Sequence, residues 1–176
     1  MSLNQHLEAT RQALRDASRA LDAAEAAGEP AALSQALAEV GHGHRRLGAW
    51  AEGVWYAERG LNLARGLPAV DASVDALCEL AEMSAMLAER NDERIDARGV
   101  HRLRDGARDH AFEAARLALR SADPQWEITV LLRLSDLFDG LGDHDDAIVL
   151  QCRAVELMSG SARAGVDITG LGIRSA

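Results

Sequence analysis

The sequence has 176 residues, of which 27% are charged, and its formal net charge at pH 7 is −9. No run of about 18 apolar residues is present, and residues 1–6 lack the basic and apolar parts of a signal peptide, so we expect neither a membrane span nor export. An acidic chain is poorly suited to phosphate binding, which argues against nucleic acid as a partner. Without an export signal or a membrane span, a cytoplasmic protein is expected.

The predicted elements are all helices, because Val, Ile and Thr are sparse and no strand-like alternation is sustained. Apolar residues recur at helical spacing in successive segments, and glycine or proline separates most of these segments. In chain order the predicted helices are about 2–27, 31–47, 49–65, 71–90, 107–122, 125–139 and 143–158. We therefore predict one all-α domain over residues 1–158, followed by a flexible tail at 159–176 that is rich in glycine and serine.

Residues 91–105 interrupt this pattern. Their arginines alternate with acidic residues, and only Ile95, Val100 and Leu103 are sizeable apolar side chains. Interleaved charges of this kind indicate a solvated surface rather than a nucleic-acid patch. The stretch could be a loop, a short extra helix or a prolongation of both neighbouring helices. Because a helix must bury an apolar stripe, we favour an exposed, partly helical insertion and pair 71–90 with 107–122 as one hairpin.

Two parts of the chain share one spacing of small and turn residues. In the first part, successive steps of 7, 2, 3, 4 and 3 residues connect Gly41, Gly48, Trp50, Gly53, Ala57 and Gly60. The same steps connect Ser135, Gly142, His144, Ala147, Gln151 and Ala154. Small residues in these segments would let two helices approach closely, and the glycine at 48 or 142 would make the tight turn between them.

This pattern resembles the tetratricopeptide repeat family, in which Leu-Gly and an aromatic precede a turn glycine and the second helix carries spaced alanines. The segments 37–61 and 131–158 match two repeat units, and the run Leu-Gly-Asp-His-Asp-Asp-Ala from Leu141 is close to the usual turn of the family. The resemblance implies antiparallel helical hairpins stacked as a short right-handed superhelix, an α-solenoid. The helices at 71–90 and 107–122 would form a third unit between these two.

Members of this family hold peptides or partner proteins on a concave face that is lined by the first helix of each hairpin. The resemblance therefore implies a groove formed by Gln35, Ala38, His42, Arg45, Arg46, Asp75, Cys78, Glu82, Met86, Thr129, Leu132, Asp136 and Asp139. One end of this groove would be cationic and the far part acidic, which favours a partner of mixed charge. His42 and Ala38 stand where some family members have the lysine and asparagine that grip a chaperone's C-terminal carboxylate, so that partner class is not expected.

Catalytic and metal-binding patterns are weak in this sequence. Glu39 and His42 have the Glu-x-x-His spacing of di-iron helical bundles, but no second copy exists and a solvated helix face is the simpler interpretation. Cys78 and Cys152 lie in apolar helical patterns and are interpreted as two buried thiols rather than a disulfide. We therefore expect no cofactor, no metal and no catalytic residue.

Three aromatic residues lie on one predicted helix: Trp50, Trp55 and Tyr56. Trp50 occupies the place of the turn aromatic in the resemblance and is expected to pack between helices. Trp55 and Tyr56 fall on other faces of the helix, which leaves both packing between repeats and a binding hot spot open for them.

The function predicted from these features is a non-catalytic adaptor or regulatory scaffold that binds a protein or peptide. The alternatives are an assembly or secretion chaperone for one client protein and, less favoured, a metal-dependent helical-bundle enzyme. Terminal repeats leave an apolar face, so a homodimer is also considered, and the tail could instead fold back into a groove through Val166, Ile168, Leu171 and Ile173. Replacing Arg45 and Arg46 by glutamate is expected to weaken binding without unfolding the chain.

Overall fold

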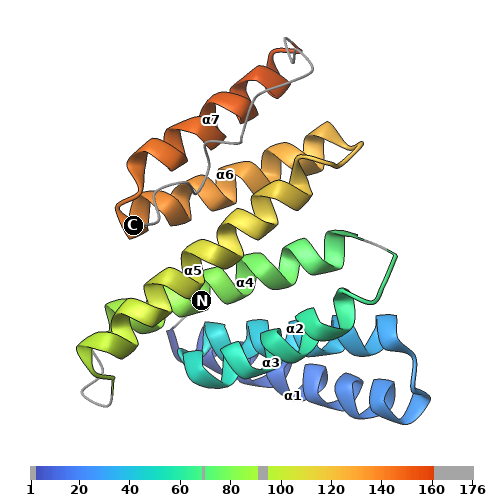
Figure 1. Cartoon of the computed structure of the whole chain (residues 1–176). Helices are drawn as coiled ribbons and strands as arrows, with labels where there is room; N and C mark the ends of the chain where they lie inside the picture. Colours follow the sequence, from blue (N-terminus) through green and yellow to red (C-terminus); the bar gives the residue numbers. More distant parts are fainter. Residues whose placement is uncertain (1–2, 69, 91–94, 161–176) are drawn as a thin grey trace.

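The computed structural model describes residues 3–68, 70–90 and 95–160, and within these ranges all regular structure is helical (Figure 1). The helices are α1 (Leu3–Ala27), α2 (Pro30–Arg46), α3 (Trp50–Ala64), α4 (Val70–Glu89), α5 (Ala97–Ala118), α6 (Pro124–Leu141) and α7 (His144–Met158). The all-α prediction is confirmed for these ranges. Within them, no helix is both long enough and apolar enough to cross a lipid bilayer. Of the predicted tail, residues 161–176 lie outside the described part of the chain.

Helix α5 differs most from the prediction. It begins at Ala97 rather than near 107, so the predicted start of this helix is wrong. Residues 97–105 are helical and mostly exposed, as predicted for this stretch, but they prolong α5 rather than stand apart from it. Asp96 caps this start by accepting a hydrogen bond from the Gly99 N–H at 2.7 Å, and Asp105 pairs with Arg108 one turn further on. Capping and local ion pairs thus stabilise helix even where few apolar side chains are buried. Residues 91–94 of the predicted insertion lie outside the described ranges.

Consecutive helices pack against one another, and α4 lies at the centre because it contacts α2, α3, α5 and α6. Among the described helices, α1 contacts α2 alone and α7 contacts α6 alone. The α4–α5 pair packs tightly, since the buried positions of α5 are all alanines with 0% exposure: Ala107, Ala111, Ala114, Ala115 and Ala118. Larger side chains of α4, such as Leu77 and Leu80, form one core cluster with all of these alanines except Ala107.

The hairpins α2–α3 and α6–α7 are closely similar in length and in their turns. A shift of 94 residues carries the first residue of α2, Pro30, onto Pro124, and carries both ends of α3 onto both ends of α7. The turn residues Gly48 and Gly142 match under the same shift and have φ angles of 74° and 85°, a region that favours glycine. The repeated hairpin predicted from the spacing of small residues is therefore present, and the packing is consistent with a helical repeat.

Candidate functional site

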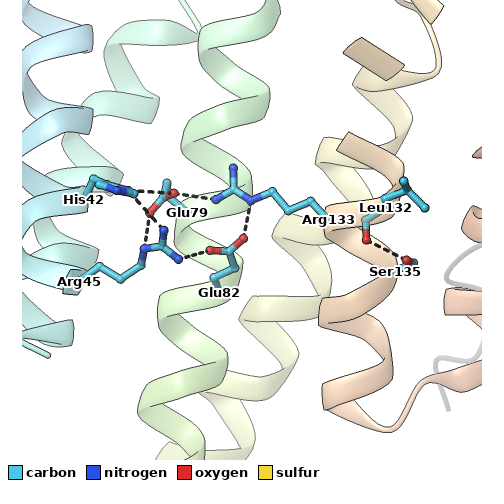
Figure 2. A network of polar contacts seen from close by, with 7 residues as sticks. All are labelled: His42, Arg45, Glu79, Glu82, Leu132, Arg133 and Ser135. Atoms are coloured by element: carbon cyan, nitrogen blue, oxygen red, sulfur yellow. Dashed lines mark hydrogen bonds and ion pairs between the residues drawn. The ribbon is translucent and has the colours of Figure 1, made fainter. Parts of the chain in front are cut away.

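Five side chains that carry or can carry charge meet where α4 lies between α2 and α6, and we call them the charged cluster (Figure 2). The members are His42 and Arg45 from α2, Glu79 and Glu82 from α4, and Arg133 from α6. A spacing of three residues places the two α2 members on one side of their helix and the two α4 members on one side of theirs. Because α4 contacts both other helices, its carboxylates reach an arginine on either side.

The contacts in the charged cluster form one connected network. Arg45 places its Nε 3.1 Å from Glu79 Oε2 and donates a hydrogen bond from Nη1 to Glu82 Oε2 at 2.6 Å. From the opposite side, Arg133 donates from Nη2 to Glu79 Oε1 at 2.6 Å and from Nε to Glu82. His42 Nδ1 lies 3.6 Å from Glu79 Oε1. Each glutamate therefore contacts both arginines, so the network ties α2 and α6 to α4.

The charged cluster is only partly accessible to solvent. The side chains of Glu79 and Glu82 are 14% and 20% exposed, those of Arg45 and Arg133 are 28% and 31% exposed, and that of His42 is 43% exposed. Ion pairs in such surroundings are less screened than surface pairs, although desolvation offsets part of the gain. Burial disfavours the charge on Arg133, but the hydrogen bond and negative charge of Glu82 outweigh burial and raise the pKa of Arg133 above its ordinary value.

A small pocket lies beside the charged cluster, between α2, α3 and α4. Its lining consists of Ala38, Gly41, His42, Ala57, Gly60, Ala76, Glu79 and Met83. Most of these residues are alanine or glycine, so the pocket exists where side chains are too short to fill the space between the helices. His42 and Glu79 belong to both the pocket and the charged cluster, which brings an apolar recess and a charged surface together.

Three of the predicted groove residues, His42, Arg45 and Glu82, meet in the charged cluster. Those that lie exposed on α2, α4 and α6 are Gln35, Arg46, Asp75, Met86, Thr129, Leu132, Asp136 and Asp139. Asp139 is not directed toward the charged cluster but pairs with His144 across the α6–α7 turn at 2.6 Å. The hydrogen bond and charge of Asp139 raise the pKa of His144.

Two predictions about the cysteines are wrong. Cys78 does not line a groove, because its side chain is 1% exposed and belongs to the core cluster, where burial raises its pKa to about 12. Cys152 is exposed rather than buried, since it lies on a side of α7 that no described helix covers. Neither cysteine forms a disulfide, as predicted.

Glu79 and Arg133 belong to the charged cluster but were not among the predicted groove residues. Glu79 lies four residues after Asp75 and three before Glu82, so helical spacing carries the signal that would have found it. Arg133 lies four residues after Thr129, so helical spacing likewise puts it on the same side of α6 as a predicted groove residue. Its position also corrects the predicted charge pattern, because α6 brings a cation to the carboxylates of α4 and is not purely acidic on this side.

A separate aromatic feature lies on α3. Trp55 is 54% exposed, its ring meets Tyr56 edge-on with centroids 4.8 Å apart, and the Arg59 guanidinium lies 5.8 Å from the Trp55 centroid. Tyr56 in turn stacks on His44 of α2 at 5.2 Å. Trp50 packs against the main core cluster, so its predicted packing role is confirmed, whereas Trp55 presents its ring to solvent.

Acidic, His and Cys side chains are the groups that most often bind metal ions in proteins. In the part of the chain that the structure describes, no three such residues are grouped so as to hold a metal ion. Glu39 is exposed, whereas its Glu-x-x-His partner His42 contacts the charged cluster.

Neither a protein-family model nor a curated protein matches the sequence. The function is therefore inferred from the geometry of the fold and of the charged cluster.

Proposed function

We propose that the chain is a helical-repeat module, similar to tetratricopeptide repeats, that binds a peptide or protein segment and has no catalytic role of its own. The binding surface consists of the exposed sides of α2, α4 and α6, which we call the first-helix face. The observation that carries this proposal is the charged cluster, because it joins the first helices of three consecutive hairpins on one side of the molecule. A right-handed superhelical stack of these hairpins would place the first-helix face on its hollow side.

The first-helix face offers a partner both charged and apolar contacts. Met86 and Leu132 are each 38% exposed on this face, and His42 and Glu79 line part of the small apolar pocket beside the charged cluster. Interfaces commonly combine a few apolar anchors with polar groups around them, and the anchors carry most of the binding energy. A segment of mixed charge that carries at least one apolar side chain fits this combination.

Met86 provides the test of this surface, because it lies on the central helix α4 and is exposed outside the charged cluster. The substitution Met86→Arg places a long cationic side chain in the middle of the first-helix face. In capture experiments with the immobilised full chain, we expect at least one bound protein to decrease about tenfold, the effect of losing an anchor worth about 1.4 kcal/mol. Quantitative mass spectrometry of the captured proteins measures this decrease.

Leu7→Arg is the matched control, because Leu7 has the same 38% exposure but lies on α1, outside the first-helix face. The captured protein that decreases with Met86→Arg should bind the Leu7→Arg control as well as it binds the unchanged chain. Both variants should keep their helical circular dichroism. Equal loss of capture in the two variants, or no protein lost specifically with Met86→Arg, would contradict the proposed surface.

A further inference from the structure

One face of the α2–α3 hairpin has a counterpart in the α6–α7 hairpin that differs sharply in exposure. Under the 94-residue shift, the α3 residues Val54, Ala57, Leu61 and Ala64 correspond to the α7 residues Ile148, Gln151, Val155 and Met158. Both sets follow helical spacing and lie on one side of their helix. We call the α7 set the terminal face.

On α3, the corresponding face is covered by the next hairpin. Ala57, Leu61 and Ala64 are 3%, 4% and 0% exposed, and Val54 packs against the core. Ala57 and Leu61 share a core cluster with residues of α4 such as Leu77, and α3 and α4 are in contact. In this fold, a second helix thus buries this face against the element that follows it in the chain.

On α7, the terminal face is bare. Ile148, Val155 and Met158 are 56%, 60% and 56% exposed, and Gln151 is exposed as well. Helix α7 lies at the opposite end of the array from α1, and no described helix packs on it except α6 (Figure 1). Three large apolar side chains in a row on a solvent-facing side are contrary to the usual pattern of an amphipathic helix, which points to an additional covering element.

We propose that residues 161–176 of the same chain cover the terminal face. Helix α7 ends at Met158, and Gly160 has a φ of 63°, a left-handed conformation that ends a helix and redirects the chain that follows. Helix α7 has 15 residues, and an extended chain advances about 3.3 Å per residue against 1.5 Å in a helix. About seven residues are therefore enough to run back along the whole of α7.

The chemistry of this segment matches the surface that it would cover. Its aliphatic residues are Val166, Ile168, Leu171 and Ile173, and most of its other residues are Gly, Ala, Ser or Thr. Small residues allow the backbone to approach a helix closely, while the aliphatic side chains fill the spaces between the exposed ones. The segment would replace the missing next hairpin, which agrees with the requirement that stacked repeats be capped at their ends. This proposal does not depend on the binding function proposed for the first-helix face.

Cys152 reports directly on the terminal face, because it lies four residues after Ile148 and three before Val155 and is exposed in the described part of the chain. The other thiol, Cys78, is buried and has a raised pKa, so it reacts slowly and serves as an internal control for folding. In the full chain, we expect 5,5′-dithiobis(2-nitrobenzoate) to modify Cys152 about tenfold more slowly than in the variant Ile168→Asp plus Leu171→Asp. The slow rate should not depend on protein concentration.

The matched control is Ser161→Asp plus Ser175→Asp, which adds the same charge to the segment and keeps its aliphatic side chains. This control should retain the slow reaction, and Cys78 should stay unreactive in every variant. Equal Cys152 rates in the full chain and in the Ile168→Asp, Leu171→Asp variant would overturn the proposal. Slow modification that accelerates on dilution would overturn it too, because a second copy of the chain would then be the covering element.

Discussion

Arg45 and Arg46 are neighbours in the sequence but have contrasting surroundings. The Arg45 side chain is 28% exposed and contacts both Glu79 and Glu82, whereas Arg46 is exposed. A glutamate at position 45 would add a third carboxylate to the charged cluster and leave Arg133 as its only arginine. The structure therefore changes the expectation that both arginines can be reversed in charge without cost to folding.

We expect Arg45→Glu to lower the free energy of unfolding by about 2–3 kcal/mol, somewhat less than the loss on breaking a fully buried ion pair. Arg46→Glu, the same change one residue later, should stay within about 0.5 kcal/mol of the unchanged chain. Urea unfolding followed by circular dichroism measures both values. Similar losses for the two variants would show that the charged cluster contributes little to stability.

The members of the charged cluster could be predicted only in part. The resemblance to the repeat family implied one surface for His42, Arg45 and Glu82, and the structure brings these three side chains into one network. The contact of Arg133 with Glu79 depends on how closely α6 approaches α4, and the spacing of residues within a single helix does not contain that distance.

Among the helices, α5 is distinguished by a buried side that consists of alanine. Ala111 is 0% exposed and lies in the core cluster that α5 shares with α4. We expect Ala111→Leu to lower the free energy of unfolding by about 1–3 kcal/mol, because the added methyl groups would force α4 and α5 apart. Ala97→Leu, an exposed position at the start of the same helix, should change it by no more than about 0.5 kcal/mol. Thermal and urea unfolding of both variants test this, and an unchanged stability for Ala111→Leu would mean that the α4–α5 contact is not tightly packed.

The helix boundaries followed from the sequence because apolar periodicity and the glycine and proline signals agree at most of them. Pro30 and Pro124 begin α2 and α6, and Gly48 and Gly142 separate these helices from α3 and α7. The start of α5 was different, because the Asp96 cap and local ion pairs stabilise this turn without the apolar stripe on which the prediction depended.

At the scale of the whole molecule, α4 has the most neighbours, since it packs on α2, α3, α5 and α6, whereas α1 packs on α2 alone among the described helices. The backbone amides of a central element open only when much of the structure opens with it. We expect peptides from α4 to exchange hydrogen for deuterium most slowly and peptides from α1 to exchange fastest among the helices. Mass spectrometry of deuterated peptic fragments measures the order, and exchange in α4 as fast as in α1 would contradict it.

The order of the hairpins could be read from the repeated spacing of small residues, because each turn glycine and each small contact residue has a local structural cause. Which outer faces of the hairpins are covered could not be read from the sequence. Leu61 and Val155 occupy equivalent positions with similar side chains, yet one is 4% and the other 60% exposed, because exposure depends on the element that follows each hairpin.

The charged cluster also affects how a partner would arrive. Its two guanidinium groups and two carboxylates lie within a few ångströms of one another, so their fields cancel at the distances from which a diffusing molecule approaches. The charged cluster therefore does not steer molecules in solution toward itself, and the association rate of a partner at the cluster should respond only weakly to ionic strength. Discrimination between partners at this place would arise after contact, through how long each complex survives.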